Sequence, residues 1–105
     1  MANRHRGEIE ATLSGERYTL VLTLGALAEL EAAFGGEDML ALATRFETGQ
    51  IGARDAMRVI GAGLRGAGYD IRDEEVSAMQ AEGGATGFIA IVADLLSATF
   101  GGAAA

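Results

Sequence analysis

Cysteine, proline, tryptophan and lysine are absent from the 105-residue sequence, and histidine occurs once. Without cysteine the chain can form neither a disulfide framework nor a thiolate metal site, which fits a reducing interior. His5 has no cysteine or second histidine to work with, so the usual nucleophile–base pairs cannot be assembled. A D-x-D-x-D-G loop for a hard cation is also missing. We therefore expect a protein that is not an enzyme, with no catalytic, cofactor-binding or metal-binding residues.

Basic charge and long apolar runs are also scarce. All eight positive side chains are arginines, against fifteen carboxylates, and the net charge is −7. Such a surface does not suit a nucleic-acid backbone. The longest apolar stretch, around residues 87–100, is broken by Asp94 and is shorter than the span of about 20 residues that a bilayer requires. Because residues 1–7 also do not resemble a secretion signal, we expect a soluble cytoplasmic protein that binds neither nucleic acid nor membrane.

The sequence does contain an alternating segment near its start. Apolar and polar residues alternate through residues 8–23, with one interruption at Ser14-Gly15. If that dipeptide forms a two-residue turn, Ala11 faces Tyr18 and the apolar faces of both strands coincide. This pattern predicts a β-hairpin that leans on other elements, because an isolated hairpin is only marginally stable.

Beyond the hairpin, apolar residues recur at helical spacing and glycines mark the helix ends. We expect Thr23 and Thr86 to cap the first and last helices. The expected helices cover residues 24–34, 37–48, 52–67, a short stretch starting at 73 and carrying Val76 and Met79, and 86–100.

These elements predict an α+β fold that is mostly α, with an N-terminal β-hairpin followed by about four to five short helices. We expect residues 1–105 to form one small domain, since no linker is long enough to divide it. Within it, residues 7–23 form the hairpin and residues 24–100 are helical, whereas residues 1–6 and 101–105 are expected to be disordered.

Residues 61–66, GAGLRG, form a literal G-x-G-x-x-G, the string that opens many dinucleotide-binding units. That fingerprint requires a buried strand before the string and a second strand after it. Residues 53–60 instead have helical spacing, and residues 73–82 resemble a helix. We therefore interpret the string as part of a helix, in which Gly63 allows close packing and Gly66 loosens the helix end.

Three arginines, Arg54, Arg58 and Arg65, lie in line on the same helix. One interpretation is a solvated face with intramolecular partners such as Asp55 or Glu47. The other is a docking stripe for an acidic segment of another protein.

The last helix is apolar over about half of its circumference, which is wider than the ordinary core stripe of roughly 100°. Either this helix is central and covered on two sides, or part of it contacts a partner. The candidate contact residues are Phe88, Ile91, Leu95, Leu96 and Phe100.

The order of these features resembles a known family. The segment YTLVLTLGALAELEAAFG (18–35) is followed by GEDMLALATRFETGQIGARDAMRVIGAGLRGAG (36–68) and a closing apolar helix. This resembles the small tail proteins of gene transfer agents and related siphophage-like prophages, over residues 7–100. The family is described both as a tail tube protein and as a tail assembly chaperone, and it supplies no catalytic motif.

The resemblance implies a role in building a phage-like tail. Chaperones of this family coat the helical tape measure protein, keep it soluble and recruit tail tube subunits. A tube subunit normally needs a substantial β-sheet to close a ring, whereas this sequence offers one hairpin. We therefore expect a tail assembly chaperone with the tape measure and tail tube proteins as partners. The alternative is a tail tube or minor tail protein retained in the particle tail, and association of the chain with its own copies stays open.

Overall fold

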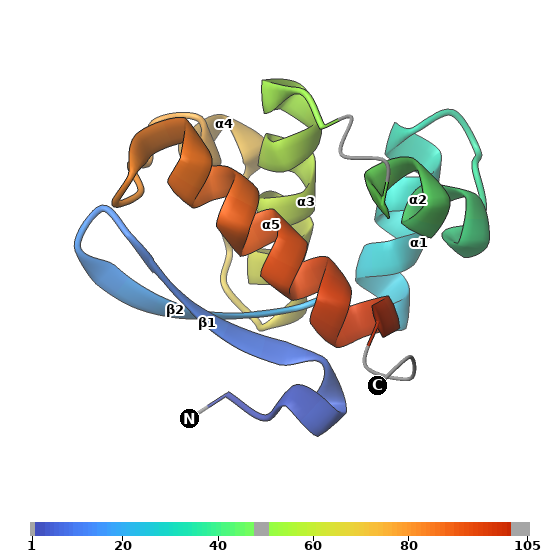
Figure 1. The fold of residues 1–105 in the computed structure, drawn as a ribbon, viewed down its shortest axis with the longest axis horizontal. Coiled ribbons are helices and arrows are strands. Elements are labelled where there is room, and N and C mark those ends of the chain that lie inside the picture. Colours follow the sequence, from blue (N-terminus) through green and yellow to red (C-terminus); the bar gives the residue numbers. More distant parts are fainter. Residues whose placement is uncertain (1, 48–50, 102–105) are drawn as a thin grey trace.

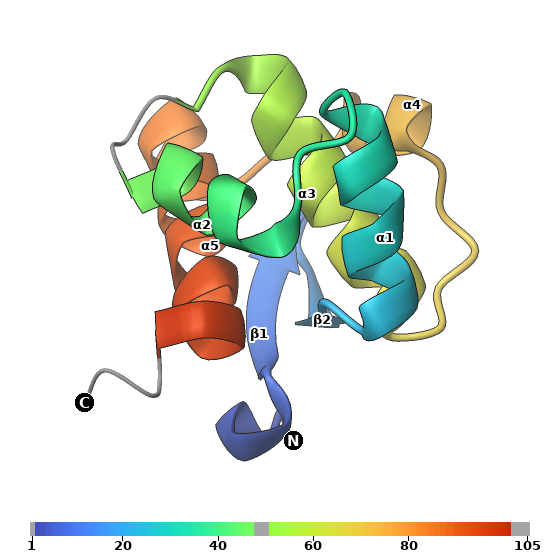
Figure 2. The same cartoon turned by 90° about the vertical axis from the view of Figure 1, so that its right-hand side faces the viewer.

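The structure consists of a hairpin covered on one side by helices (Figures 1 and 2). The computed structural model describes residues 2–47 and 51–101, so most of the expected disordered stretch 101–105 lies outside the described residues. A two-strand hairpin followed by five helices confirms the expected mostly helical α+β fold. In chain order the elements are η1 (Arg4–Arg6), β1 (Glu8–Leu13), β2 (Glu16–Val21), α1 (Leu24–Ala33), α2 (Met39–Glu47), α3 (Ala53–Gly66), α4 (Asp73–Val76) and α5 (Gly84–Phe100).

The hairpin has the register that the alternation predicts. Ala11 pairs with Tyr18, as predicted. The two turn residues, Ser14 with φ 51° and Gly15 with φ 80°, both adopt the left-handed conformation that a type I′ turn requires. One face of the hairpin is therefore apolar and faces the helices, and its fully buried members include Leu13 and Leu20.

Two crossing helices cover that apolar face. Helix α3 packs on β2 and helix α5 packs on β1, while α1 lies against α3 and α2 contacts both α1 and α5 (Figure 2). The side chains at the centre of these contacts are fully buried: Ile60, Leu64, Val92 and Leu95. Within the described residues, no helix has the length and apolar content of a membrane span.

Helices α1 and α2 follow their capping residues. The Thr23 hydroxyl accepts a hydrogen bond from Ala26 N (3.1 Å), which confirms the expected N-cap of α1. Helix α2 starts at Met39 rather than at Glu37. The reason is that the Asp38 carboxylate accepts a hydrogen bond from Ala41 N (2.8 Å), as a capping side chain does.

Part of the segment 1–6, which we expect to be disordered, has a defined conformation in the structure. Arg4–Arg6 forms a 3-10 turn, and the Asn3 side chain accepts a hydrogen bond from its backbone (3.0 Å). Arg4 Nη1 also lies 2.8 Å from Asp94 Oδ1 on α5. The ion pair and the cap together tie this segment to the helical layer.

The fourth helix is shorter than expected and ends before Met79. Beyond Val76 the chain turns and pairs with the end of β1: Ser14 N donates to Gln80 O (2.7 Å) and Gln80 N donates to Ser14 Oγ (3.0 Å). Backbone pairing with the hairpin thus replaces the last helical turn. This long-range contact is not visible in the local sequence pattern.

The last helix begins earlier than expected, at Gly84, so Thr86 lies inside its first turn and is not its N-cap. Gly83 and Gly84 have φ angles of +88° and +61°, which side-chain-bearing residues rarely adopt. The two glycines turn the chain directly into the helix without a side-chain cap.

Both edges of the hairpin are partly occupied by other segments. At the β1 edge, Glu8 N donates to Asn3 O (3.1 Å), and the strand end pairs with residues 80–81. At the β2 edge, Thr19 N donates to the Tyr69 hydroxyl (3.4 Å). Other segments thus contact β1 at both of its ends and β2 at Thr19.

Candidate functional site

Helices α3 and α5 cross at Gly63, the middle glycine of the G-x-G-x-x-G string. A Cβ at this position would lie 2.8 Å from Leu95 Cδ2 and 3.2 Å from Leu20 Cβ. Only glycine leaves room for both leucines against the helix backbone. The expected close packing is thereby confirmed, and the string lies wholly inside the helix Ala53–Gly66 rather than in a strand–turn–helix phosphate loop.

Gly66 has a different role from the expected one. We expected it to loosen the end of the helix, but it brings the helix onto the backbone of β2. A Cβ on Gly66 would overlap with the Val21 carbonyl oxygen. Gly68, with φ +102°, terminates the helix as expected.

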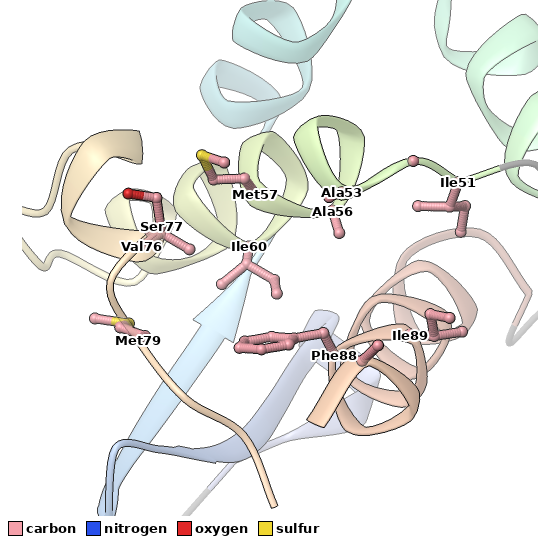
Figure 3. A pocket seen from close by; sticks show the side chains of 12 residues that line it. Ile51, Ala53, Ala56, Met57, Ile60, Val76, Ser77, Met79, Phe88 and Ile89 are labelled. Atoms are coloured by element: carbon pink, nitrogen blue, oxygen red, sulfur yellow. The ribbon is translucent and has the colours of Figure 1, made fainter. Parts of the chain in front are cut away.

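An apolar pocket of about 300 Å³ lies between α3 and α5 on the N-terminal side of their crossing (Figure 3). The first turns of α3 form one wall, the start of α5 forms another, and α4 with the residues after it closes a third side. The larger side chains that line it are Ile51, Met57, Ile60, Val76, Met79, Phe88 and Ile89.

The pocket has a buried floor and an open apolar rim. Ile60 is 1% exposed, whereas Ile89 at the rim is 51% exposed. Met57 and Met79 are half-buried, and unbranched methionine side chains adapt readily to differently shaped partners. The pocket can therefore receive large apolar side chains from outside.

The candidate contact residues of the last helix separate into different environments. Leu95, one of the candidate contact residues, is fully buried at the crossing with Gly63 and presents no surface to a partner in this structure. Ile91, Leu96 and Phe100 are half-buried and pack against the core, and of the five only Phe88 lines the pocket. The helix is thus largely covered, and its most exposed large apolar side chain, Ile89, lies in its N-terminal half.

Arg65, the last member of the predicted arginine stripe, joins three elements. Its guanidinium forms an ion pair with Glu29 on α1, lies 3.0 Å from Asp73 Oδ1 on α4, and donates to Ile71 O (2.8 Å). The hydrogen bond to Glu29 is the main reason that the pKa of Arg65 is raised above its ordinary value. Partial burial opposes this effect and Asp73 reinforces it.

The other two arginines differ from Arg65. Arg58 donates to a carbonyl oxygen at the end of α1 (3.4 Å) and lies over the Phe34 ring, 5.8 Å from its centroid. Arg54 is exposed, and within the described residues it has no ion-pair or hydrogen-bond partner. Of the three, Arg54 is therefore the one whose guanidinium has no partner among the described residues and can meet an acidic group of another molecule.

Asp55, one of the two intramolecular partners that the sequence suggests for the stripe, is not used by it. Asp55 lies 3.7 Å from Arg45 and accepts a hydrogen bond from Gly52 N (3.3 Å) at the start of α3. The side chain of Glu47 lies outside the described residues. The intramolecular interpretation holds for two of the three arginines, with partners that the helix spacing could not reveal.

Replacing Arg65 with alanine is expected to lower the free energy of unfolding by about 1–3 kcal/mol, because Asp73 Oδ1 is shielded from solvent and loses its cation. Solvent screens the partly exposed partners, so the lower half of that range is expected. Urea denaturation of R65A beside R54A measures the difference. An equal, small effect of both substitutions would show that the three-element junction does not contribute to stability.

Among residues 2–47 and 51–101, no group of three or more histidine, cysteine or acidic side chains is placed to hold a metal ion. His5 lies on η1, away from the pocket lining. The protein is a small α+β domain. The pocket and the arginine stripe offer a partner apolar contacts and ion pairs.

The chain belongs to the family described as "Phage tail tube protein, GTA-gp10", whose model matches residues 6–102. The match spans the hairpin and all five helices, and it confirms the resemblance to the tail proteins of gene transfer agents. No curated protein and no solved structure matches the chain significantly.

Proposed function

We propose that the protein is a non-enzymatic tail assembly chaperone that binds the tape measure protein and assists assembly of the tail tube around it. The observation that carries this proposal is the open apolar pocket between α3, α4 and α5. A binder of amphipathic helices exposes such a surface until a partner covers it. The net charge of −7 favours solubility of a complex with an otherwise insoluble partner.

The hairpin edges favour the role of an assembly chaperone over that of a tail tube subunit. Subunits that close a tube by strand pairing need free strand edges. Here Glu8 and Ser14 at the two ends of β1 form hydrogen bonds with other segments, as does Thr19 on β2. Gly66 of α3 packs on the Val21 carbonyl oxygen. These contacts reduce the backbone that is available for pairing with a neighbouring subunit.

A structural component of the tail is the second candidate. The family description itself names a tail tube protein. In addition, Leu24 and Leu40 are 75% and 77% exposed on α1 and α2, outside the pocket. Such side chains could contact neighbouring subunits in a particle.

Two measurements on the same culture separate these candidates. The tagged protein is purified from producing cells, and finished particles are analysed by quantitative mass spectrometry. A chaperone co-purifies with the tape measure protein in the cytoplasm and is missing from particles. Recovery in particles at stoichiometric copy number, without the tape measure protein in the pull-down, would support the structural candidate and overturn the chaperone.

A further inference from the structure

The charges around the pocket are unevenly distributed. Glu74 belongs to α4, whose Val76 lines the pocket together with the following Ser77. Glu82 precedes α5, whose Ala85 lines the pocket. Both carboxylates are exposed, and neither has an ion-pair partner in the part of the chain that the structure describes. An unpaired negative charge therefore accompanies the apolar opening on the α4–α5 side.

The opposite end of the pocket carries charges of both signs. Ala53, at the start of α3, lines the pocket at the end away from Val76 and Ser77, as Figure 3 shows. Arg54 follows Ala53 directly and has no partner among the described residues. Asp55 comes next and lies 3.7 Å from Arg45. The α3 end therefore has both a cation and a carboxylate next to the lining, whereas the unpaired charges on the α4–α5 side are negative.

We infer that the pocket binds one amphipathic helix of a partner protein, whose large apolar side chains enter it and whose lysine or arginine residues lie over α4 and the start of α5. The volume of about 300 Å³ is at the low end of the range for binding pockets, roughly 300–1,000 Å³, so it holds a few side chains and not a whole helix. A chain of net charge −7 complements a basic helix flank. This inference rests on the proposed function, since it specifies the partner helix that a chaperone would hold.

Filling the pocket tests the apolar part of the inference. Ala85 is exposed and lines the pocket, so A85F occupies the opening without disturbing a buried side chain. A90F adds the same ring to an exposed position of α5 outside the lining and is the matched control. The probe is a fluorescent synthetic helix of leucine and lysine, with binding followed by anisotropy. We expect A85F to weaken binding about tenfold or more, as loss of an interface anchor does, and A90F to bind like the wild type.

Charge reversal tests the electrostatic part. The double variant E74R/E82R is compared with E10R/D70R, which changes the net charge equally at exposed carboxylates outside the pocket lining. Reversal beside the pocket is expected to weaken binding of the lysine helix about threefold to tenfold at low salt and to flatten its salt dependence. The same helix with glutamate in place of lysine should bind the wild type more weakly.

The outcomes distinguish this inference from the proposed function. If A85F and A90F bind the lysine helix equally, or the glutamate helix binds as well as the lysine helix, the inference is overturned. If the wild type and A85F retrieve the tape measure protein equally from cells, the chaperone proposal stands and the pocket assignment fails. If the wild type retrieves no tape measure protein from cells, the chaperone proposal fails. The pocket assignment still stands if A85F, unlike A90F, no longer binds the lysine helix.

Discussion

Replacing Gly66 with alanine is expected to lower the free energy of unfolding by at least about 2 kcal/mol, at the upper end of the usual range for overpacking. The new methyl group would overlap with the Val21 carbonyl oxygen. Because this obstacle is backbone rather than the end of a flexible side chain, α3 and β2 must move apart. Urea denaturation followed by circular dichroism measures the loss.

Gly25 provides the matched control, since it also lies in a helix. A Cβ on Gly25 would meet only the Thr23 hydroxyl oxygen at 3.9 Å, an ordinary contact. G25A should therefore raise the free energy of unfolding by about 0.5–1 kcal/mol, the usual gain from alanine in a helix. Equal gains from G66A and G25A would show that the contact between α3 and β2 is not as close as described.

Replacing Leu95 with alanine is expected to cost about 2–5 kcal/mol of the free energy of unfolding, the usual cost of a cavity in a packed core. Leu95 is fully buried, and its Cδ2 atom packs against the backbone at Gly63. Since a domain of this size is stable by only about 5–15 kcal/mol, the variant should melt at a markedly lower temperature. Calorimetry provides the measurement.

The control for L95A is L40A, because Leu40 is 77% exposed. Its effect should lie within about 0.5 kcal/mol, as for most surface substitutions. If L95A were as stable as L40A but no longer bound its partner protein, Leu95 would be a contact residue, which is one interpretation of the sequence pattern. A large loss of stability confirms that the crossing with α3, not a partner, buries this side chain.

The elements that could be predicted from the sequence are those specified locally. The alternation around Ser14-Gly15 fixes the hairpin register, because shifting one strand by a residue would turn its apolar face to solvent. Thr23 specifies the start of α1 through its own hydroxyl. The helical spacing of residues 53–60 places the glycine string in a helix and removes the dinucleotide interpretation.

The pocket and the arginine partners could not be predicted in this way. Met57 and Met79 come from segments on either side of a connector, and only the tertiary fold brings them to one pocket. Arg65 meets Glu29, which precedes it by 36 positions. The width of the apolar face on the last helix is compatible both with a central, covered helix and with a partner contact. Its spacing alone does not separate Phe88 at the pocket from Leu95 in the core.

The engaged hairpin edges have a consequence for crowding. The proposed coating of a long tape measure protein would bring many copies of this chain side by side, at a local concentration at which exposed strands aggregate. The Asn3 carbonyl oxygen, the Tyr69 hydroxyl and residues 80–81 each occupy backbone that a strand of another copy would otherwise pair with. These contacts oppose the growth of a continuous sheet from one copy to the next.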